Sequence, residues 1–289
     1  MMENIVYVLD SGSDFEREQL DKLNLQYPVE FIPLNIHIGD EVYLDGVNIN
    51  KKEFYEKMAQ SEELPKTSQP SPQMFFDMYK KLIDEGKQVV NLTLSSGVSG
   101  TYQSALIAKD MLEDAEKEHV HLVDTQQLSV TILLLLKKLD TLLTEGKSLN
   151  EAIGWLEDNK HKGTMFGLLD TLENLKKGGR ISSAQAMIGG LLNIKPLVEI
   201  KDGKVESLGK ARGRKKGQQL LADSIGSIDH YTSDSIFIAH NFATLDDAKQ
   251  ELSQILDVNA FEQVFYYTLG STIGTHAGPN TLGIALMKK

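Results

Sequence analysis

Short apolar segments alternate with helical patterns through the first half of the chain, and this alternation limits the possible folds more than any other feature. Residues 5–9, 88–94 and 119–125 have the composition of buried strands. Segments with helical spacing, such as residues 73–86, separate them. Because strands joined by helices form parallel sheets with right-handed crossovers, the first half is predicted to be a parallel α/β domain.

The second half has a different pattern. Asp202-Gly203 is a strong signal for a tight turn, so residues 196–212 are predicted to form a β-hairpin. Two further strand patterns, residues 261–270 and 282–289, lie on either side of a glycine-rich turn. This half is therefore predicted to be α+β, with a partly antiparallel sheet.

The predicted domain boundary lies near Lys162-Gly163, where the two patterns meet. It divides the chain into residues 1–163 and residues 164–289. Just after it, residues 171–192 are predicted to form two short helices that are split at Gly178-Gly179.

Charge and cysteine content exclude several classes of function. The 289-residue chain carries a formal net charge of −11 and no cysteine. Nucleic-acid binders usually have the opposite charge balance, and neither disulfides nor thiolate metal sites form without cysteine. The N-terminus shows no secretory signal, so we expect a cytoplasmic protein. The longest apolar run, residues 128–136, is too short to cross a bilayer and is predicted to be a buried helix, without stable membrane insertion.

The segment LTLSSGVSGTYQSA, residues 92–105, places serines and glycines between a strand and a helix. A helix N-terminus attracts anions, and Ser99 or Gly100 occupies the expected capping position. Gly97 and Gly100 are expected to let the backbone approach a ligand closely. The segment lacks the lysine of P-loops and the G-x-G-x-x-G pattern, so nucleotide phosphates are poorly supported. For this segment alone, a capped helix with nothing bound is an equally good interpretation.

Two neighbouring loops extend this candidate site. Residues 10–14 and 124–127 follow predicted strands, as residues 95–101 do. Ligands of open sheets lie outside the carboxyl ends of the strands. We therefore expect a group of polar side chains at one edge of the sheet, namely Asp10, Ser95, Ser96, Ser99 and Asp124.

Two more segments carry polar residues that could act together. Residues 66–73 are predicted to be a loop by their prolines, with Thr67 and Ser68 just before a helix that starts at a proline. Residues 270–284 place His276 among glycines and hydroxyl groups. A lone histidine is more often structural than functional, but one between a threonine and a Gly-Pro turn is a stronger candidate.

At this point the sequence resembles the DegV family. The segments that carry the resemblance, in order and spacing, are DSGSD, TSQPSP, SSGVSGTYQSA, LENLKKGGRIS with the later KP pair, and GTHAGPNTLG. The resemblance spans nearly the whole chain. It implies an α/β fold class, with an N-terminal parallel α/β domain, a C-terminal α+β domain and one fatty acid held between them. It also implies that the protein presents a long-chain fatty acid to a separate ATP-dependent kinase subunit, whose acyl-phosphate product feeds bacterial phospholipid synthesis.

The resemblance also implies which residues bind the ligand. Thr67 and Ser99 would hydrogen-bond the carboxylate, with Ser96 as the alternative to Ser99. His276 and the helix start at Gly100 would lie beside the same group. A buried carboxylate must be compensated by hydrogen bonds, which these groups can supply. We expect neutral donors without an arginine, because a bidentate arginine would reduce the nucleophilicity of the carboxylate oxygen.

The sequence departs from the family pattern at two places. Asn280 stands where the family usually has glycine, although asparagine tolerates the left-handed conformation better than most residues. Residues 128–136 replace the small residues that are usual there. That change would reshape the wall of the acyl tunnel and leave the carboxylate site unchanged.

A basic stretch, residues 209–217, stands out in this acidic chain. The simpler interpretation is a solvated helix start. The functional interpretation is a docking surface for the kinase subunit or for nucleotide phosphates, to which Arg180 and Arg212 would belong.

Other functions stay open. A serine hydrolase would use Ser99 as nucleophile and His276 as base, although the G-x-S-x-G elbow is absent. A metal enzyme would use His119 and His121, although no third ligand lies near them in the sequence. A small-carboxylate or phosphosugar binder would need a polar second domain. We expect a non-catalytic protein without metal or cofactor.

Overall fold

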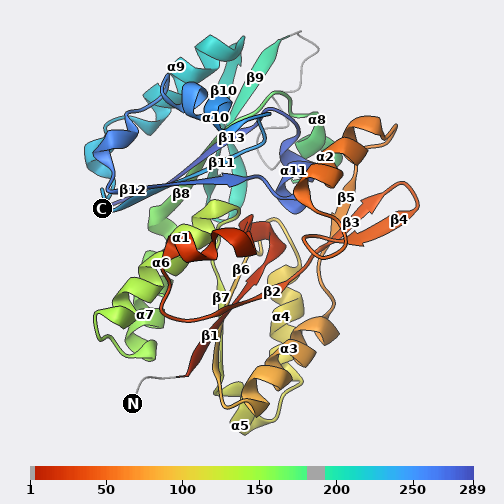
Figure 1. The fold of residues 1–289 in the computed structure, drawn as a ribbon, viewed down its shortest axis with the longest axis vertical. Helices are drawn as coiled ribbons and strands as arrows, with labels where there is room; N and C mark the ends of the chain where they lie inside the picture. The colour runs from red at the N-terminus through yellow and green to blue at the C-terminus, as the bar shows by residue number, and fades with distance from the viewer. Residues whose placement is uncertain (1–3, 181–192) are drawn as a thin grey trace.

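The computed structural model describes residues 4–180 and 193–289. Within these residues, the N-terminal part contains a sheet of four parallel strands in the order β2-β1-β6-β7 (Figure 1). The strands are β1 (Ile5–Asp10), β2 (Val29–Ile32), β6 (Gln88–Thr93) and β7 (Val120–Asp124). The predicted parallel α/β architecture is confirmed.

Helices cover both faces of this sheet, because its strands are apolar on both sides. Along β1, Tyr7 and Leu9 join one hydrophobic core, whereas Val6 and Val8 join another on the opposite face. This alternation is the two-residue period of a strand. The first face is covered by α6 (Val130–Thr144) and α7 (Leu149–Asn159), and the second by α3 (Pro72–Asp84) and α4 (Thr101–Asp110). Two short helices, α1 (Leu20–Leu23) and α5 (Asp114–Lys117), lie in the connections.

The segment between β2 and α3 in the sequence forms a small, separate antiparallel sheet. Its order is β4-β3-β5, formed by β3 (Asn35–Ile38), β4 (Glu41–Leu44) and β5 (Lys66–Ser68), and α2 (Lys51–Gln60) connects β4 to β5. The loop predicted over residues 66–73 is wrong for Lys66–Ser68, where Thr67 pairs with Ile36. The prolines come after this strand, so they do not interrupt its pairing. As predicted, Pro72 starts the next helix.

The second sheet has six strands within the described residues, in the order β10-β9-β8-β13-β11-β12 (Figure 1). They are β8 (Gly163–Leu168), β9 (Ile194–Lys201), β10 (Lys204–Arg212), β11 (Ser235–His240), β12 (Gln263–Thr268) and β13 (Leu282–Met287). Only β11 and β12 pair in parallel, which confirms the partly antiparallel prediction. The β9–β10 turn is as predicted: Asp202 and Gly203 both have positive φ, 49° and 75°.

Helices α9 (Arg214–Ile225) and α10 (Leu245–Leu252) pack against the outer face of this sheet. The glycine-rich turn predicted before β13 instead contains a helix, α11 (Ser271–Ala277). Gly270 is its N-cap and Gly278 (φ 76°) ends it, whereas Gly274 lies in the middle of the helix, where a Cβ would be 2.3 Å from the hydroxyl oxygen of Tyr55. Of the two short helices predicted over residues 171–192, the first is α8 (Glu173–Lys177), and the second lies outside the described residues.

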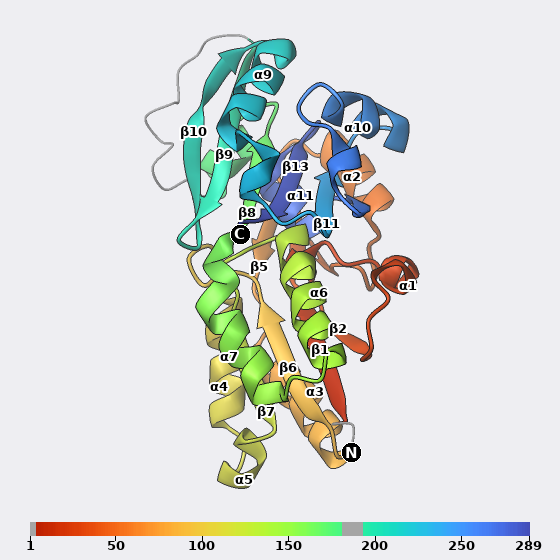
Figure 2. The same ribbon diagram turned by 90° about the vertical axis from the view of Figure 1, so that its left-hand side faces the viewer.

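The predicted buried helix over residues 128–136 is confirmed as the first half of α6, which lies between the two sheets (Figure 2). It packs against β6 on one side and against β8, β11 and β13 on the other. This double packing explains why every residue from Val130 to Leu136 is buried, since a helix with apolar residues all round must be enclosed. One continuous hydrophobic core therefore joins the two sheets. The boundary at Lys162-Gly163, where β8 begins, stays a prediction.

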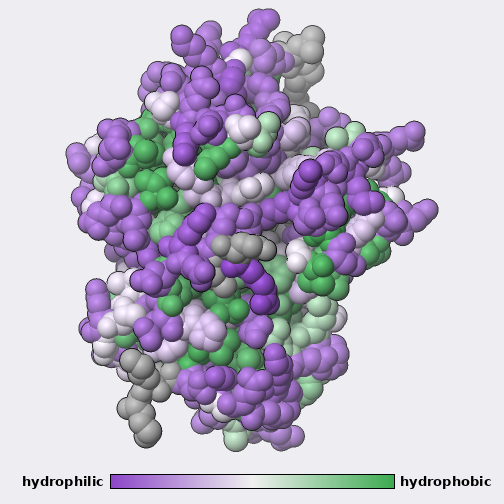
Figure 3. Space-filling view, in the orientation of Figure 1, coloured by the Kyte–Doolittle hydropathy of each residue, from purple (hydrophilic) through white to green (hydrophobic). Residues whose placement is uncertain are grey.

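The face shown in Figure 3 is mostly hydrophilic, with its hydrophobic residues in separate patches. Among the described residues, no helix combines the length and the apolar character needed to cross a membrane.

Candidate functional site

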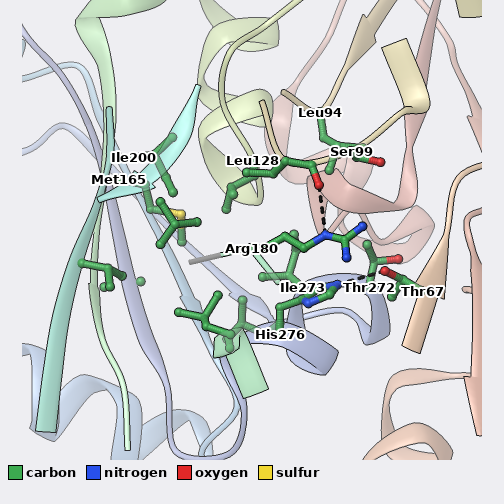
Figure 4. A pocket seen from close by; sticks show the side chains of 18 of the residues that line it. Thr67, Leu94, Ser99, Leu128, Met165, Arg180, Ile200, Thr272, Ile273 and His276 are labelled. Carbon is green, nitrogen blue, oxygen red and sulfur yellow. Dashed lines mark hydrogen bonds between the residues drawn. The ribbon is translucent and has the colours of Figure 1, made fainter. Parts of the chain in front are cut away.

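A pocket lies between the carboxyl end of the four-stranded sheet and the inner face of the six-stranded sheet (Figure 4). Its cavity volume is about 100 Å³, or about 880 Å³ when its open mouth and the spaces between the lining side chains are included. Most of the lining is apolar. It comes from strands of the six-stranded sheet (Met165, Val198 and Ile200), from loops that follow strands of the four-stranded sheet (Leu94 and Leu128) and from α11 (Ile273). The pocket is therefore narrow, and its walls suit a thin apolar chain.

Polar side chains gather at one end of this pocket. Thr67 lies on β5 and His276 in the last turn of α11, with 2.9 Å between Thr67 Oγ1 and His276 Nε2. Arg180 lies beside this pair, whereas Met165 and Ile200 lie toward the opposite end (Figure 4). The pocket thus has a polar end and an apolar end.

The other ring nitrogen of His276 is enclosed by protein. Nδ1 is buried and has no hydrogen-bond partner among residues 4–180 and 193–289. The backbone of Gly178 lies against it, so a Cβ on Gly178 would be 2.4 Å from Nδ1. Burial, with a smaller contribution from the charge of Arg180, lowers the pKa of His276 to about 4. The imidazole is therefore neutral at pH 7.

Ser99 also lines the pocket, from the turn just before α4. Its Oγ accepts a hydrogen bond from the Thr101 backbone N–H at 3.3 Å and lies 2.9 Å from Thr101 Oγ1. The N-cap of α4 is Gly100, which is one of the two positions, Ser99 and Gly100, that were predicted for it. Because Thr101 is buried, its hydroxyl fixes Ser99 at the pocket wall.

The other polar residues that were expected at this edge have partners within the protein. Ser96 donates from its backbone N–H and its hydroxyl to the Asp124 carboxylate, at 3.1 and 2.5 Å, and does not line the pocket. Ser95 donates to the carbonyl of Gly203 at 2.6 Å. Asp10 accepts from the backbone N–H of Leu94 at 2.8 Å, and burial raises the pKa of its carboxyl to about 7. Of the five side chains, only Ser99 reaches the pocket.

The two glycines of the serine turn lie close to other parts of the protein. A Cβ on Gly97 would lie 2.4 Å from the carbonyl oxygen of Gly203, and one on Gly100 would lie 2.8 Å from Nε2 of Gln69. Both glycines therefore allow close packing of protein against protein. Sequence alone does not show this, because the packing partners come from distant segments.

An arginine lies at the polar end of the pocket, although only neutral donors were expected there from the sequence. This residue is Arg180. Its guanidinium donates to the carbonyl of Val98 at 3.2 Å and to that of Gly178, and it lines the pocket while remaining solvent-exposed. Arg212 is exposed at the end of β10, away from the pocket. Within the same basic stretch, Arg214 binds Glu251 and does not belong to a free surface.

Two buried carboxylates that sequence reasoning did not assign to the site hold the start of α11. Asp14 accepts from the backbone N–H of Gly270 at 2.8 Å and from the hydroxyl of Ser129. Asp45 accepts from the backbone N–H and hydroxyl of Thr272, at 3.0 and 2.6 Å. The first N–H groups of a helix have no acceptor within the helix, and these carboxyl oxygens accept from two of the N–H groups at this end. These contacts orient the helix that carries His276, and the signal for Asp14 was its place in the DSGSD loop.

Two glycines on neighbouring strands line the apolar end of the pocket. Gly167 on β8 pairs directly with Gly283 on β13, and both line the pocket. A Cβ on Gly283 would lie 2.1 Å from Cε of Met165, so the Met165 side chain occupies the space above Gly283. Because methionine is flexible, this part of the pocket can adapt to its contents.

His119 and His121, which were considered as metal ligands, lie on or next to β7 and contact other protein groups. His119 Nδ1 lies 2.8 Å from the side-chain amide nitrogen, Nε2, of Gln88. Burial lowers the pKa of His121. Within the part of the chain that the structure describes, no three histidine, aspartate or glutamate side chains are arranged to hold a metal ion.

Comparisons with known proteins agree over the whole chain. Residues 4–289 match the family described as uncharacterised proteins of the DegV family. A DegV domain-containing protein of Clostridium perfringens is 32% identical over 288 residues, which cover 98% of this chain and 97% of the relative.

Solved structures are similar as well. A DegV family protein of Thermus thermophilus, described by its fatty acid binding, is 31% identical with a TM-score of 0.85, over 99% of this chain and 100% of that one. The fatty acid kinase B3 protein of Streptococcus pneumoniae, loaded with linoleic acid, is 25% identical with a TM-score of 0.85, over the same shares. With its fold and its sequence in agreement, the chain belongs to the DegV family.

Proposed function

We propose that the protein binds one long-chain fatty acid in this pocket and presents its carboxylate to a separate ATP-dependent kinase subunit. The observation that carries the proposal is the polarity of the pocket: a narrow apolar space with hydroxyl, imidazole and guanidinium groups at one end. That arrangement is complementary to a carboxylate with a long alkyl chain.

The carboxylate would lie between Thr67 and Ser99, whose side chains line the pocket and carry neutral hydroxyl donors. An ionised carboxylate only accepts hydrogen bonds, so each hydroxyl must donate to it. Arg180 adds a positive charge at the same end and is solvent-exposed, which weakens its interaction through screening. His276 contributes as a neutral group.

The alkyl chain would supply most of the affinity. Each buried methylene contributes about 0.8 kcal/mol, so a dozen of them contribute on the order of 10 kcal/mol before the costs of association. A hydrogen bond to a charged group contributes about 1.5–3 kcal/mol. Loss of one hydroxyl should therefore weaken binding without abolishing it, while its effect on acyl transfer can be complete.

The hydrolase alternative is weaker than this proposal. Hydrolysis would need a hydrogen bond between Ser99 and His276, but among the described contacts Ser99 pairs with Thr101 and His276 with Thr67. The small-carboxylate or phosphosugar alternative does not use the apolar end. The fatty acid named with the Streptococcus pneumoniae relative and the binding named with the Thermus thermophilus relative support the lipid proposal.

The test is denaturing mass spectrometry of organic extracts from the purified protein. We expect a fatty acid in stoichiometric amount, and acyl-phosphate formation when the loaded protein meets a bacterial fatty acid kinase subunit and ATP. The protein alone should form no product from acyl esters. An extract without acid, together with no uptake of added acids, would overturn the proposal.

A further inference from the structure

The direction of the hydrogen bond between Thr67 and His276 decides what the polar end can bind. The two atoms, Thr67 Oγ1 and His276 Nε2, are 2.9 Å apart, and either could carry the shared hydrogen. A threonine hydroxyl has a single hydrogen, so it cannot donate to the imidazole and to a ligand at the same time. The tautomer of His276 therefore controls the chemistry that Thr67 offers to the pocket.

The surroundings of Nδ1 distinguish the two neutral tautomers. Nδ1 is buried, has no partner among the described residues and faces the backbone of Gly178, where a Cβ would be 2.4 Å away. Glycine has a hydrogen in the Cβ direction, so a C–H group lies against Nδ1. A hydrogen on Nδ1 would meet that C–H and would be a buried donor without an acceptor, which proteins avoid. A lone pair on Nδ1 fits the same place, because C–H groups are weak donors.

The protonated form of His276 does not fit this site either. An imidazolium would again place a hydrogen on Nδ1, and it would lie beside the guanidinium of Arg180. Burial and this like charge both oppose a second positive charge.

From this geometry we propose that His276 is a neutral Nε2–H tautomer that donates to Thr67 Oγ1 and thereby fixes the Thr67 hydroxyl as a donor toward the pocket. His276 is thus a positioning residue, which acts on the ligand through Thr67. The assignment of the tautomer stands on the protein alone. Its consequence for a carboxylate rests on the proposed function, since the bound group must be an acceptor.

The tautomer can be measured directly. Protein labelled with ¹⁵N-histidine is purified, stripped of lipid and examined at pH 7 by long-range ¹H–¹⁵N correlation, with and without palmitic acid. The His276 signals are assigned by their loss in the His276→Gln variant. We expect a protonated Nε2 and an unprotonated Nδ1 in both samples. A protonated Nδ1, alone or in an imidazolium, would overturn the proposal.

Binding of palmitic acid by variants gives an independent readout. The amide N–H of His276→Gln can replace the Nε2–H donor, so we expect affinity within about threefold of the wild type. His276→Ala removes the donor and should weaken binding by about tenfold, as Thr67→Val should. Thr67→Ser keeps the hydroxyl and should bind nearly as the wild type does. Equal losses in His276→Gln and His276→Ala would contradict the donor role.

A control separates this role from general destabilisation. His240 on β11 is also buried but lies outside the pocket lining. His240→Gln should leave palmitic acid binding unchanged. The outcomes also separate the two proposals: a protein that takes up no fatty acid refutes the proposed function, whereas one that binds acid with Nδ1 protonated refutes only the role of His276.

Discussion

The carbonyl oxygen of Gly203 packs against Gly97, so that a Cβ on Gly97 would lie only 2.4 Å from it. Gly203 forms the tip of the β9–β10 hairpin in the six-stranded sheet, and Gly97 lies in the loop after β6 of the four-stranded sheet. The contact therefore links a loop of one sheet to a loop of the other. The hydroxyl of Ser95 donates to the same carbonyl at 2.6 Å. The serine turn therefore holds the hairpin tip, and only its last serine, Ser99, faces the pocket.

Gly97→Ala tests this contact. The new methyl group would collide with backbone that cannot move without shifting the hairpin, so we expect a loss of about 1–3 kcal/mol in the free energy of unfolding, measured in urea. The matched control is Gly154→Ala in α7, where no atom lies within 4 Å of the new Cβ. That change should stabilise the protein by about 0.5–1 kcal/mol, because alanine favours the helix. Similar effects of the two changes would refute the contact.

Met165→Ala should shift the ligand preference toward longer chains. The Met165 side chain occupies the space above Gly283 at the apolar end of the pocket, and its removal opens that space. Each additional methylene that is buried there should contribute about 0.8 kcal/mol, or roughly fourfold in affinity. Competition among saturated acids of increasing length measures the shift. Met111→Ala, at an exposed position, should leave the preference as it is, and an unchanged preference in Met165→Ala would place the end of the chain elsewhere.

Asp14→Asn should change how stability depends on pH. Burial raises the pKa of Asp14 to about 7, from about 3.9 in an unfolded chain. Between these values the folded protein holds a proton that the unfolded chain has lost, so this carboxyl's contribution to stability falls as pH rises through the window. Asparagine does not titrate. The stability of Asp14→Asn relative to the wild type should therefore rise between pH 4 and pH 7, by on the order of 1 kcal/mol per unit, and level off above that range. A constant difference in urea denaturation would show that folding does not shift the pKa of Asp14.

Arg212→Glu tests the kinase-docking surface that the basic stretch suggested. Arg212 is exposed and lies outside the pocket lining, so fatty acid binding should not change. If the kinase subunit docks on this surface, the rate of acyl-phosphate formation should fall by about tenfold at low protein concentration. The decrease should be smaller at high salt, because salt screens the charge interaction. Lys147→Glu, an exposed charge reversal between α6 and α7, is the control. Equal acyl transfer in the two variants would remove this surface from consideration.

Features that depend on local sequence were predictable. The Asp202-Gly203 turn has the two positive φ values that its sequence favours, and Asn280 adopts the left-handed conformation (φ 51°) that was expected of it. The capping box of α2, between Asn50 and Glu53, is also present as its pattern indicates. Each of these features is decided by residues within a few positions of one another.

Features that depend on distant partners were not predictable. Lys66–Ser68 forms a strand because it pairs with the free edge of β3. The start of α11 is held by Asp14 and Asp45, which lie near the other end of the sequence. Arg180 was assigned to a docking surface from its charge, and its place in the pocket lining, next to the carbonyls of Val98 and Gly178, depends on such distant contacts. Residues 128–136 were expected to reshape the tunnel wall, but of these only Leu128 lines the pocket.

The double packing of α6 has a kinetic consequence for anything that occupies the pocket. Separation of the two sheets would expose the run from Val130 to Leu136, at about 1.5–3 kcal/mol for each large apolar side chain. That total is comparable with the stability of a whole domain, so such an opening is a rare event that approaches global unfolding. A ligand must therefore enter and leave by local movement of side chains at the mouth. Its residence time should lengthen with each methylene that it draws through that opening.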